Sequence, residues 1–319
     1  MRFSDVGWTD VTATTALVTQ LLRSIGYSPT VTVLSVPVTF ASVQNNDIDV
    51  FLGNWMPAQE ADRARYVEDG SVVVIGPNLT GAKYTLAVPA YAYAAGLRDF
   101  KDIQRFAPAL NESIYGIEPG NDGNRHVLEM LKQSQFGLGG FKLIESSEQG
   151  MLAQVERAYR DKKPIVFLAW EPHPMNMRFD LKYLAGGDEV FGPNFGGATI
   201  YTVTRKGYSA ECPNMGRLLA NLKFTLRGES EMMAAILDRH EAPEIADDGM
   251  AESQSHGHQG LARGSPDLRG SAGGLRAGAH RGAAASRRIR AMGRQSQDSR
   301  GRWDGSGDRL RQNARHLSL

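Results

Sequence analysis

Short apolar runs alternate with longer stretches of helical spacing over roughly the first 246 residues of the chain. The short runs are rich in β-branched and aromatic residues, which favours strands. The longer stretches repeat apolar residues every three or four positions, which predicts amphipathic helices, and this alternation is typical of an α/β protein. The predicted strands are RFSDV, TVTVLSV, IDVFLGNW, SVVVIG, YTLAVPA, SIYGIEP, FKLIES, PIVFLAW and ATIYTVT.

Helices are predicted between and after these strands. The stretch DVTATTALVTQLLRSIGY predicts a helix that Thr9 or Asp10 caps and that stops near Gly26, because short polar side chains favour helix starts and glycine favours helix ends. The other predicted helices are VPVTFASVQNND, NRHVLEMLKQSQ, SEQGMLAQVERAYRDKK, NMGRLLANLKFTL and SEMMAAILDRH.

This pattern stops at about Asp247. Residues 247–319 are rich in Gly, Ser, Ala and Arg, with Trp303 as their only aromatic residue, a composition that predicts disorder. The HGH at 256–258 and the RRIR at 287–290 are candidate sites for a metal and for a nucleic acid. Nothing nearby supplies further metal ligands, and no aromatic residues interleave with the arginines for base stacking. We therefore predict neither a metal site nor a nucleic-acid partner.

Net charge also separates this tail from the rest of the chain. The chain holds 36 Lys and Arg and 35 Asp and Glu residues; 13 Arg, no Lys and 5 acidic residues lie after residue 250, which leaves a net charge of −7 on the first 250 residues. Arginine without lysine, alongside Gly, Ala and Ser, is what GC-rich DNA yields when it is read out of frame. One back-translation of DDGMAESQSHGHQGLARGSPDLRG, shifted by one base, gives TTAWLKANPTVIKDWLAGVPTFEG, which reads like a helix and an ordinary C-terminus. We hypothesise that the tail is frame-shifted, and the gene sequence near codon 247 tests this.

The length of 319 residues, 41% of them hydrophobic, allows two domains with buried cores. No apolar run reaches the about 18 residues that a membrane-spanning helix needs, and no basic start followed by an apolar stretch marks a signal peptide. The single cysteine, Cys212, rules out an intramolecular disulfide and a cysteine-built metal site. We expect Cys212 to be a buried, small apolar residue.

Local motifs of known enzymes are absent from the first 246 residues. The sequence contains no G-x-S-x-G, no P-loop and no H-E-x-x-H, and the HEAPE at His240 lacks the second histidine. His126 and His173 stand far from it and from each other in the sequence. An enzyme that uses Asp10 or Glu171 as an acid or base stays open as an alternative, but no cofactor and no catalytic residue is predicted.

Large aromatic residues stand at the ends of predicted strands. Trp8 follows RFSDV, Trp55 ends IDVFLGNW and Trp170 ends PIVFLAW, while Tyr84 opens YTLAVPA. In open α/β sheets, ligands bind beyond the carboxyl ends of the strands. One such aromatic residue is best explained by core packing, but three tryptophans beside polar residues make a ligand site a competing explanation. The polar neighbours are Asp10, Asn54 and Glu171.

Several long motifs resemble one known family. RFSDVGWTD, DIDVFLGNWMP, YGIEPGNDGN, IVFLAWEPHPMN and FGPNFGGATIYT are similar to the choline-binding members of the glycine-betaine/choline substrate-binding family of bacterial ABC importers, and the resemblance covers residues 2–246. It implies a two-lobed periplasmic-binding-protein fold with a ligand cleft between the lobes. Residues 1–82 and 203–246 would form lobe 1, residues 83–202 would form lobe 2, and residues 247–319 would be the disordered tail.

The resemblance also implies the residues of the site. Trp8, Trp55, Tyr84 and Trp170 would form an aromatic cage around a trimethylammonium group, and Asp10 and Asn121 would lie near the polar end of the ligand. A quaternary ammonium has no N–H to donate, whereas each aromatic face attracts it by roughly 0.5–2 kcal/mol. Ionised Asp10 favours choline over a betaine, since a betaine carboxylate beside it would be a like-charge contact.

Alternatives remain for single residues and for the function. Asp10 is also a candidate helix cap, Asn121 a turn residue, and Glu171 and His173 are expected to shape a loop rather than touch ligand. The resemblance implies a monomer that delivers choline to a membrane permease; a glycine-betaine or proline-betaine binder is the alternative within the family. Members of this family work in the periplasm, but no leader precedes Met1 as written, which leaves a periplasmic and a cytoplasmic product both open.

Overall fold

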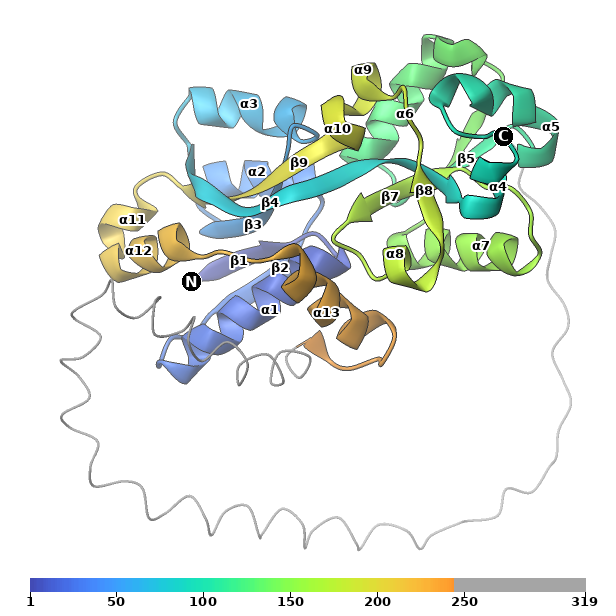
Figure 1. The fold of residues 1–319 in the computed structure, drawn as a ribbon. Coiled ribbons are helices and arrows are strands. Elements are labelled where there is room, and N and C mark those ends of the chain that lie inside the picture. Colours follow the sequence, from blue (N-terminus) through green and yellow to red (C-terminus); the bar gives the residue numbers. More distant parts are fainter. Residues whose placement is uncertain (244–319) are drawn as a thin grey trace, which may run out of the picture. The chain divides into compact units, whose positions relative to one another are not determined.

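The computed structural model describes residues 1–243. The predicted disorder and frame shift of residues 247–319, with the HGH and RRIR clusters, lie outside the described residues. Within them, the predicted α/β organisation is confirmed: a single sheet is flanked by helices (Figure 1). Its strands are β1 (Arg2–Asp5), β2 (Thr30–Val33), β3 (Val50–Met56), β4 (Val72–Pro89), β5 (Ser113–Tyr115), β6 (Lys142–Ile144), β7 (Phe167–Glu171), β8 (Leu181–Tyr183) and β9 (Gly197–Arg205).

Helices fill the connections between these strands. Every predicted helix is present, whereas the helix at Glu60–Glu68, the short helices and strand β8 were not predicted. The longer helices are α1 (Thr9–Ser24), α2 (Val36–Gln44), α3 (Glu60–Glu68), α6 (Asp122–Lys132), α7 (Glu148–Arg160), α12 (Pro213–Asn221) and α13 (Leu226–Leu237). The short ones are α4 (Ala90–Ala94), α5 (Ala107–Leu110), α8 (Met175–Arg178), α9 (Asp188–Phe191), α10 (Pro193–Gly196) and α11 (Tyr208–Glu211), with 3-10 turns η1 (Phe100–Phe106) and η2 (Gln135–Gly137).

The sheet joins two parallel groups of strands through an antiparallel centre. Its strand order is β2-β1-β3-β9-β4-β7-β5-β6, and β8 pairs with β4. β1 pairs in parallel with β2 and β3, and β5 pairs in parallel with β6 and β7. β4 and β9 run antiparallel beside each other between the two groups (Figure 1). We call these groups, with their helices, the β1–β3 side and the β5–β7 side.

Strand β4 corrects one prediction. SVVVIG and YTLAVPA were expected to be two strands, but Val72–Pro89 is one strand that pairs with β9 on one side and β7 on the other. The Gly and Pro residues between the two motifs are absorbed by register shifts between Val74 and Gly76 and further along the strand, which bend it without ending it. The predicted lobe boundaries at 82/83 and 202/203 therefore fall inside β4 and β9, and the division into lobes stays a prediction.

Two helix ends also differ from the prediction. The cap position of α1 is Trp8 rather than Thr9 or Asp10, and no side chain of α1's own start caps it. The helix predicted from NMGRLLANLKFTL ends at Asn221, because Leu222 is extended and the Phe224 N–H donates to the Asn78 carbonyl at 2.7 Å. α13 then begins after Thr225, whose hydroxyl accepts from the Gly228 N–H at 3.0 Å.

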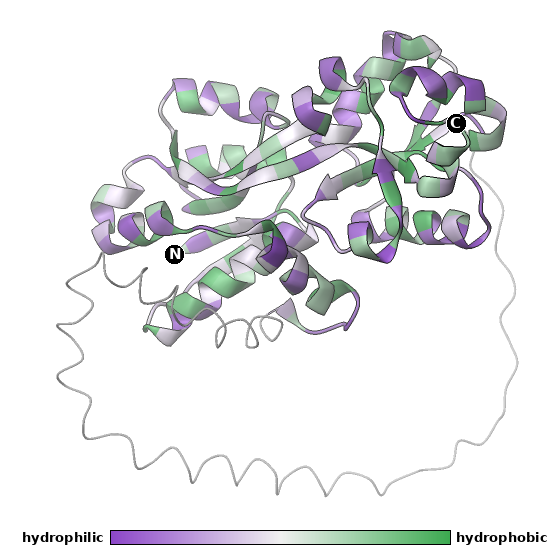
Figure 2. Ribbon diagram, in the orientation of Figure 1, coloured by the Kyte–Doolittle hydropathy of each residue, from purple (hydrophilic) through white to green (hydrophobic). Residues whose placement is uncertain are grey.

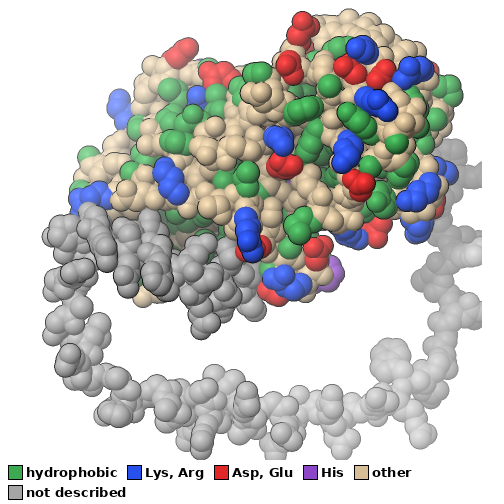
Figure 3. Space-filling view, viewed as in Figure 1, with side chains coloured by type: hydrophobic (Ala, Val, Ile, Leu, Met, Phe, Trp, Pro, Cys, Tyr) green, Lys and Arg blue, Asp and Glu red, His purple; other side chains and the backbone are tan. Residues whose placement is uncertain are grey.

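The core is built from the buried apolar side chains of the strands; along β4 and β9, green hydrophobic positions in Figure 2 alternate with white and purple ones. One cluster of buried side chains extends from the β1–β3 side to the β5–β7 side, and a smaller one around Phe3, Leu22 and Met215 lies between α1, β3 and α12. Cys212, between α11 and α12, is exposed, so the expectation of a buried cysteine was wrong. The surface in Figure 3 mixes basic and acidic side chains. No helix among residues 1–243 is long and apolar enough to cross a bilayer.

Candidate ligand-binding site

Five of the six predicted site residues line one cavity between the two sides of the sheet. The space bounded by their side chains measures about 280 Å³, part of which is open to solvent. The sixth predicted residue, Asn121, does not line the cavity. Two residues that sequence analysis did not single out, Ile117 and Asp122, do line it. The lining residues are Trp8, Asp10, Trp55, Tyr84, Ile117, Asp122 and Trp170.

Four aromatic rings, the aromatic wall, form most of this lining: Trp8, Trp55, Tyr84 and Trp170. Tyr84 stands among them, with its ring centroid 6.1 Å from that of Trp55 at 61° and 6.2 Å from that of Trp170 at 88°. These edge-to-face contacts are a favourable arrangement of aromatic quadrupoles. Tyr84 and Trp170 are direct partners in the pairing of β4 with β7, so the sheet itself sets their spacing.

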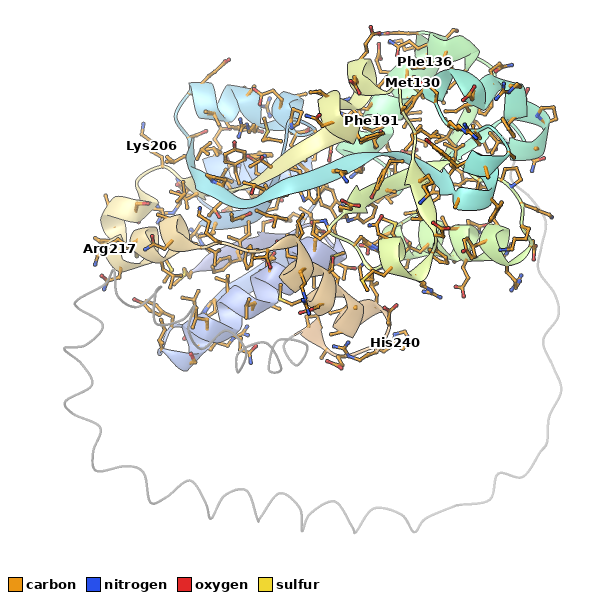
Figure 4. All side chains as sticks on the ribbon, viewed as in Figure 1. Met130, Phe136, Phe191, Lys206, Arg217 and His240 are labelled. Carbon is orange, nitrogen blue, oxygen red and sulfur yellow. The ribbon has the colours of Figure 1, made fainter. Side chains whose placement is uncertain are left out.

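The ring of Phe191 supports Tyr84 from outside the cavity. Phe191 ends the short helix α9 (Figure 4). Its ring centroid lies 6.2 Å from that of Tyr84 and 6.1 Å from that of Phe100. Gly123 allows an equally close approach at the hydroxyl end of Tyr84, since a Cβ on Gly123 would overlap that hydroxyl. Tyr84 is therefore held at both ends of its ring.

Hydrogen bonds orient three of the four rings. The Trp8 Nε1–H donates to Glu118 Oε1 at 2.7 Å, and the Trp55 Nε1–H donates to Asp10 Oδ2 at 3.0 Å. The Tyr84 hydroxyl donates to Asn121 Oδ1 at 2.8 Å. Since these polar tips are used inside the protein, the rings present their apolar and π-rich surfaces to the cavity.

Asn121 acts on the cavity through Tyr84. Besides the Tyr84 hydroxyl, its Oδ1 accepts from the backbone N–H groups of Gly123 and Asn124 at 2.8 and 3.2 Å, and its Nδ2 donates to Glu118. The side chain of Asn121 thus caps the start of α6. This structural role is similar to the alternative of a turn residue that the sequence analysis left open. Its predicted contact with a ligand stays a prediction.

Two carboxylates, Asp10 and Asp122, form the acidic wall of the cavity. Their exposed fractions are 4% and 1%. Oδ1 of Asp10 and both oxygens of Asp122 have no hydrogen-bond partner among residues 1–243. Asp122 was missed because it stands next to Asn121 in the PGNDGN motif, where a helix start explains an acidic residue equally well.

Burial sets the electrostatics of this wall. The pKa of Asp10 is raised to about 7, mainly by burial and further by the negative charge of Glu148. The hydrogen bond from Trp55 acts in the opposite direction and lowers the pKa. Burial likewise raises the pKa of Asp122 to about 7; the charges of Asp62 and Glu118 add to this, and Arg125 opposes it. Carboxylates that are costly to ionise alone are stabilised when a cation enters beside them.

A buried glutamate connects the two sides beside the cavity. Glu148, at the start of α7, accepts from the Thr9 N–H at 2.9 Å and from the Thr9 hydroxyl at 2.7 Å, so it caps α1 from the β5–β7 side. His173 Nδ1 accepts from the Met175 N–H, which leaves Nε2–H to donate to Glu148 at 3.0 Å. Sequence analysis missed Glu148 because its partners are 139 and 25 residues away.

An ion pair joins the same two sides at the surface. Arg125 of α6 donates to both oxygens of Asp62 of α3, at 2.7 and 3.3 Å. With Glu118 on Trp8 and Glu148 on Thr9, this pair holds the β5–β7 side against the β1–β3 side. The structure therefore holds its two sides in contact beside the cavity.

The lining of the cavity is suited to binding an organic cation. Glu171, the other proposed acid or base, is outside the lining and pairs with Lys83 at 3.0 Å. Nowhere in the described part of the chain do three or more His, Cys, Asp or Glu side chains gather as metal ligands would. An aromatic box with a buried carboxylate binds organic cations that have an apolar coat.

Comparison with known proteins agrees with this geometry. The family described as the substrate binding domain of ABC-type glycine betaine transport system (OpuAC) matches residues 1–252. An uncharacterized protein, ORF1, of Chromohalobacter salexigens is 51% identical over 124 residues, which are 39% of this chain and 80% of that protein.

Solved structures are similar over most of the chain. An ABC-transporter choline binding protein in complex with choline is 56% identical, with a TM-score of 0.81 over 83% of this chain and 91% of that one. An ABC-transporter choline binding protein in an unliganded semi-closed conformation is 58% identical, with a TM-score of 0.74 over 79% of this chain and 88% of that one. The predicted periplasmic-binding-protein fold is thereby confirmed.

Proposed function

Because the chain belongs to the family of substrate-binding domains of ABC-type glycine betaine transport systems, we propose that it captures choline in this cavity and delivers it to a membrane permease. The observation that carries this proposal is that four aromatic rings and two buried carboxylates line one cavity. The 56% identity to a choline binding protein in complex with choline supports it.

Physical chemistry favours a quaternary ammonium as the occupant. The trimethylammonium head has methyl groups that gain from burial against aromatic faces and a charge that gains from their quadrupoles, at roughly 0.5–2 kcal/mol for each ring. Trp8, Trp55, Tyr84 and Trp170 would supply those faces. Asp10 would supply the counter-charge and accept a hydrogen bond from the hydroxyl of choline.

Choline suits the acidic wall better than a betaine does. A betaine carries a carboxylate, which would approach the buried side chain of Asp10 or Asp122, and such a like-charge contact is costly. The family description names glycine betaine, so a betaine binder is the second candidate. The relative affinities for choline and glycine betaine decide between the two.

Delivery to a permease requires that the bound ligand stabilises a closed arrangement of the two lobes. We take residues 1–82 and 203–246 as one lobe and residues 83–202 as the other, with β4 and β9 as the two crossings. The contacts of Glu148 with Thr9 and of Arg125 with Asp62 would then form when the lobes close around the ligand. The proposed carrier works as a monomer in the periplasm and leaves its ligand chemically unchanged.

Calorimetric titration of the full chain with choline and with glycine betaine tests this function. We expect choline to bind with a dissociation constant of about 10 μM or below, which corresponds to a binding free energy of about −7 kcal/mol. We expect glycine betaine to bind more weakly. Choline recovered intact after incubation distinguishes a carrier from an enzyme. Tighter binding of glycine betaine would reject the choline assignment, and consumption of choline would reject the carrier.

A further inference from the structure

His173 is a buried side chain to which the proposed function gives no task. It is 2% exposed, and both ring nitrogens are used: Nδ1 accepts from the Met175 N–H at 2.9 Å, and Nε2–H donates to Glu148 Oε1 at 3.0 Å. The ring also meets that of Trp170 edge to face, with the two centroids 4.8 Å apart at 75°. His173 therefore touches one ring of the aromatic wall and holds the carboxylate that reaches across to the β1–β3 side.

The loop after β7 keeps its shape through other hydrogen bonds. The Asn176 Nδ2 group donates to the carbonyls of Trp170 and His173 at 2.8 and 3.0 Å, and its Oδ1 accepts from the Tyr183 hydroxyl at 2.9 Å. These bonds join residues of the loop to one another and to β8, so they hold the loop without Glu148. The bond from His173 Nε2–H leads out of the loop, and its effect is on Glu148.

Glu148, in turn, is not needed by its own helix. Helix α7 is capped by Ser147, whose hydroxyl accepts from the Gly150 N–H at 3.0 Å. The Glu148 carboxylate instead accepts from the N–H and the hydroxyl of Thr9 on the β1–β3 side. Helix α1 has no side-chain cap of its own, and a carboxylate at a helix N-terminus is favourable, so Glu148 supplies the cap that α1 lacks.

These contacts connect the two sides by a route outside the cavity. In order along this route stand Trp170, His173, Glu148 and Thr9. Thr9 is the sequence neighbour of two lining residues, Trp8 and Asp10, so the cap fixes the backbone that carries them. Neither His173 nor Glu148 lines the cavity. The route can therefore affect a ligand only through the residues that do.

We propose that His173 is a positioning residue for choline retention: it orients Glu148 to cap α1 across the two sides, and so slows the release of choline without contacting it. This inference rests on the proposed function, because it assumes choline in the cavity and lobes that separate to release it. The Nε2–H donor keeps the Glu148 carboxylate in one orientation, so less side-chain freedom is lost when the cap forms. A weaker cap makes separation of the two sides easier and leaves the encounter with choline unchanged, which places the effect in the dissociation rate.

Two substitutions in the full chain separate this role from a purely local one. His173→Gln carries an amide N–H that can reach Glu148 but no acceptor at the place of Nδ1, whereas His173→Asn carries an acceptor at the place of Nδ1 but ends short of Glu148. With stopped-flow tryptophan fluorescence, we expect choline to dissociate about tenfold faster from His173→Asn and at most about threefold faster from His173→Gln, with association rates nearly unchanged. A histidine that only shapes the loop predicts the reverse order.

A double-mutant cycle across the two sides shows whether His173 acts through Glu148. Thr9→Val removes the hydroxyl that donates to Glu148 and keeps the shape of the side chain. It should itself speed choline dissociation about threefold or more, and in combination with His173→Asn the increase should be at least about threefold smaller than the product of the two single increases. Urea unfolding without choline should show additive effects, because His173 and Thr9 belong to different lobes, which are apart when no ligand holds them.

Two results would overturn the role of His173 while choline binding by the unaltered chain still supports the proposed function. One is faster dissociation from His173→Gln than from His173→Asn, and the other is a pair of rate increases that multiply in the double variant. If His173→Asn does not fold, His173→Gln takes its place in the cycle, and an increase that multiplies with that of Thr9→Val overturns the proposal as well. If the unaltered chain does not bind choline, the proposed function fails, and the inference fails with it.

Discussion

The aromatic wall and the acidic wall of the cavity differ in how far the protein itself satisfies their polar atoms. The polar tips of Trp8, Trp55 and Tyr84 all donate to protein acceptors. For Trp55 and Tyr84 the acceptor belongs to the same proposed lobe, so these two rings are fixed before any ligand arrives. Asp10 and Asp122 keep three oxygens unpartnered within residues 1–243. One wall is preorganised and stable; the other is electrostatically strained until a cation binds.

This difference separates the contributions of the two walls to stability and to binding. Removing an aromatic ring should weaken both the fold and the site, because the ring is part of the core. Removing a carboxylate charge should weaken the site but strengthen the ligand-free fold, because an unpaired buried charge opposes folding. The expected signs are therefore opposite for the two walls.

Removal of a ring is expected to have the largest effect. Trp170→Ala should lower the free energy of unfolding by about 3–5 kcal/mol, the usual range for a buried large-to-small change, and should abolish measurable choline binding. Trp170→Phe is the matched variant: the Trp170 indole has no hydrogen bond within the described residues, so this change keeps an aromatic face and should cost far less. Urea unfolding and calorimetry measure both effects. Choline binding by Trp170→Ala at an unaltered affinity would contradict the cage.

The charge of Asp10 should show the opposite signs. Asp10→Asn keeps an acceptor for the Trp55 Nε1–H and removes the charge. At pH 8 we expect choline to bind roughly 30-fold more weakly and the ligand-free protein to be more stable by about 1–3 kcal/mol. Unfolding and titration of the same preparation check both signs. If Asp10→Asn is less stable than the unaltered chain and still binds choline well, the expected opposite effects of the two walls on stability and binding are contradicted.

The pH dependence follows from the same carboxylates. The folded-state pKa of Asp10 and of Asp122 is about 7, above the unfolded value of about 4, so the folded chain binds more protons between these values. The contribution of both groups to ligand-free stability therefore falls as pH rises from 4 to 7 and is then constant. Choline prefers the ionised forms, so its affinity should fall by up to about tenfold for each pH unit and carboxylate below pH 7.

Thermal unfolding between pH 5 and 8, with and without choline, measures this linkage. We expect the rise in midpoint caused by choline to grow with pH and to reach its plateau above pH 7. The double variant with Asp10→Asn and Asp122→Asn is the control, in which that growth should disappear. A choline effect that is constant over the whole pH range in the unaltered chain would contradict the assignment.

Gly123 offers a smaller way to disturb the aromatic wall alone. Gly123→Ala would place a methyl group against the hydroxyl of Tyr84 and push the ring from its position opposite Trp170. We expect a loss of choline affinity of about tenfold, with a small loss of stability. Tyr84→Phe removes the clashing oxygen but keeps the ring carbons that the methyl group would also meet, so Gly123→Ala should cost less affinity in the Tyr84→Phe background than in the unaltered chain, as titration can show. An equal cost in both backgrounds would mean that the effect does not pass through the hydroxyl of Tyr84.

The sequence predicted the aromatic wall better than the acidic one. Tryptophans at strand ends and one long family resemblance were enough to group Trp8, Trp55, Tyr84 and Trp170, because strands that pair in one sheet bring their ends together. Asp122 was missed because a helix start explains an acidic residue in PGNDGN equally well, and Glu148 was missed because its partners lie far along the chain. The continuous strand β4 was missed for the opposite reason: its Gly and Pro residues give a strong local turn signal, which tertiary pairing with β9 overrides.

The pair of Arg125 and Asp62 is expected to have the smallest effect, because it holds the walls together without belonging to either. Arg125 is 39% exposed at its side chain, so solvent screens the pair, and a coupling of about 0.2–1 kcal/mol is expected. A double-mutant cycle with Arg125→Met and Asp62→Asn, measured on choline affinity at low and high salt, isolates this coupling. It should shrink at high salt and appear in the dissociation rate, since the pair stabilises the closed state. A coupling that is independent of salt, or that appears for ligand-free stability alone, would show that closure does not depend on this contact.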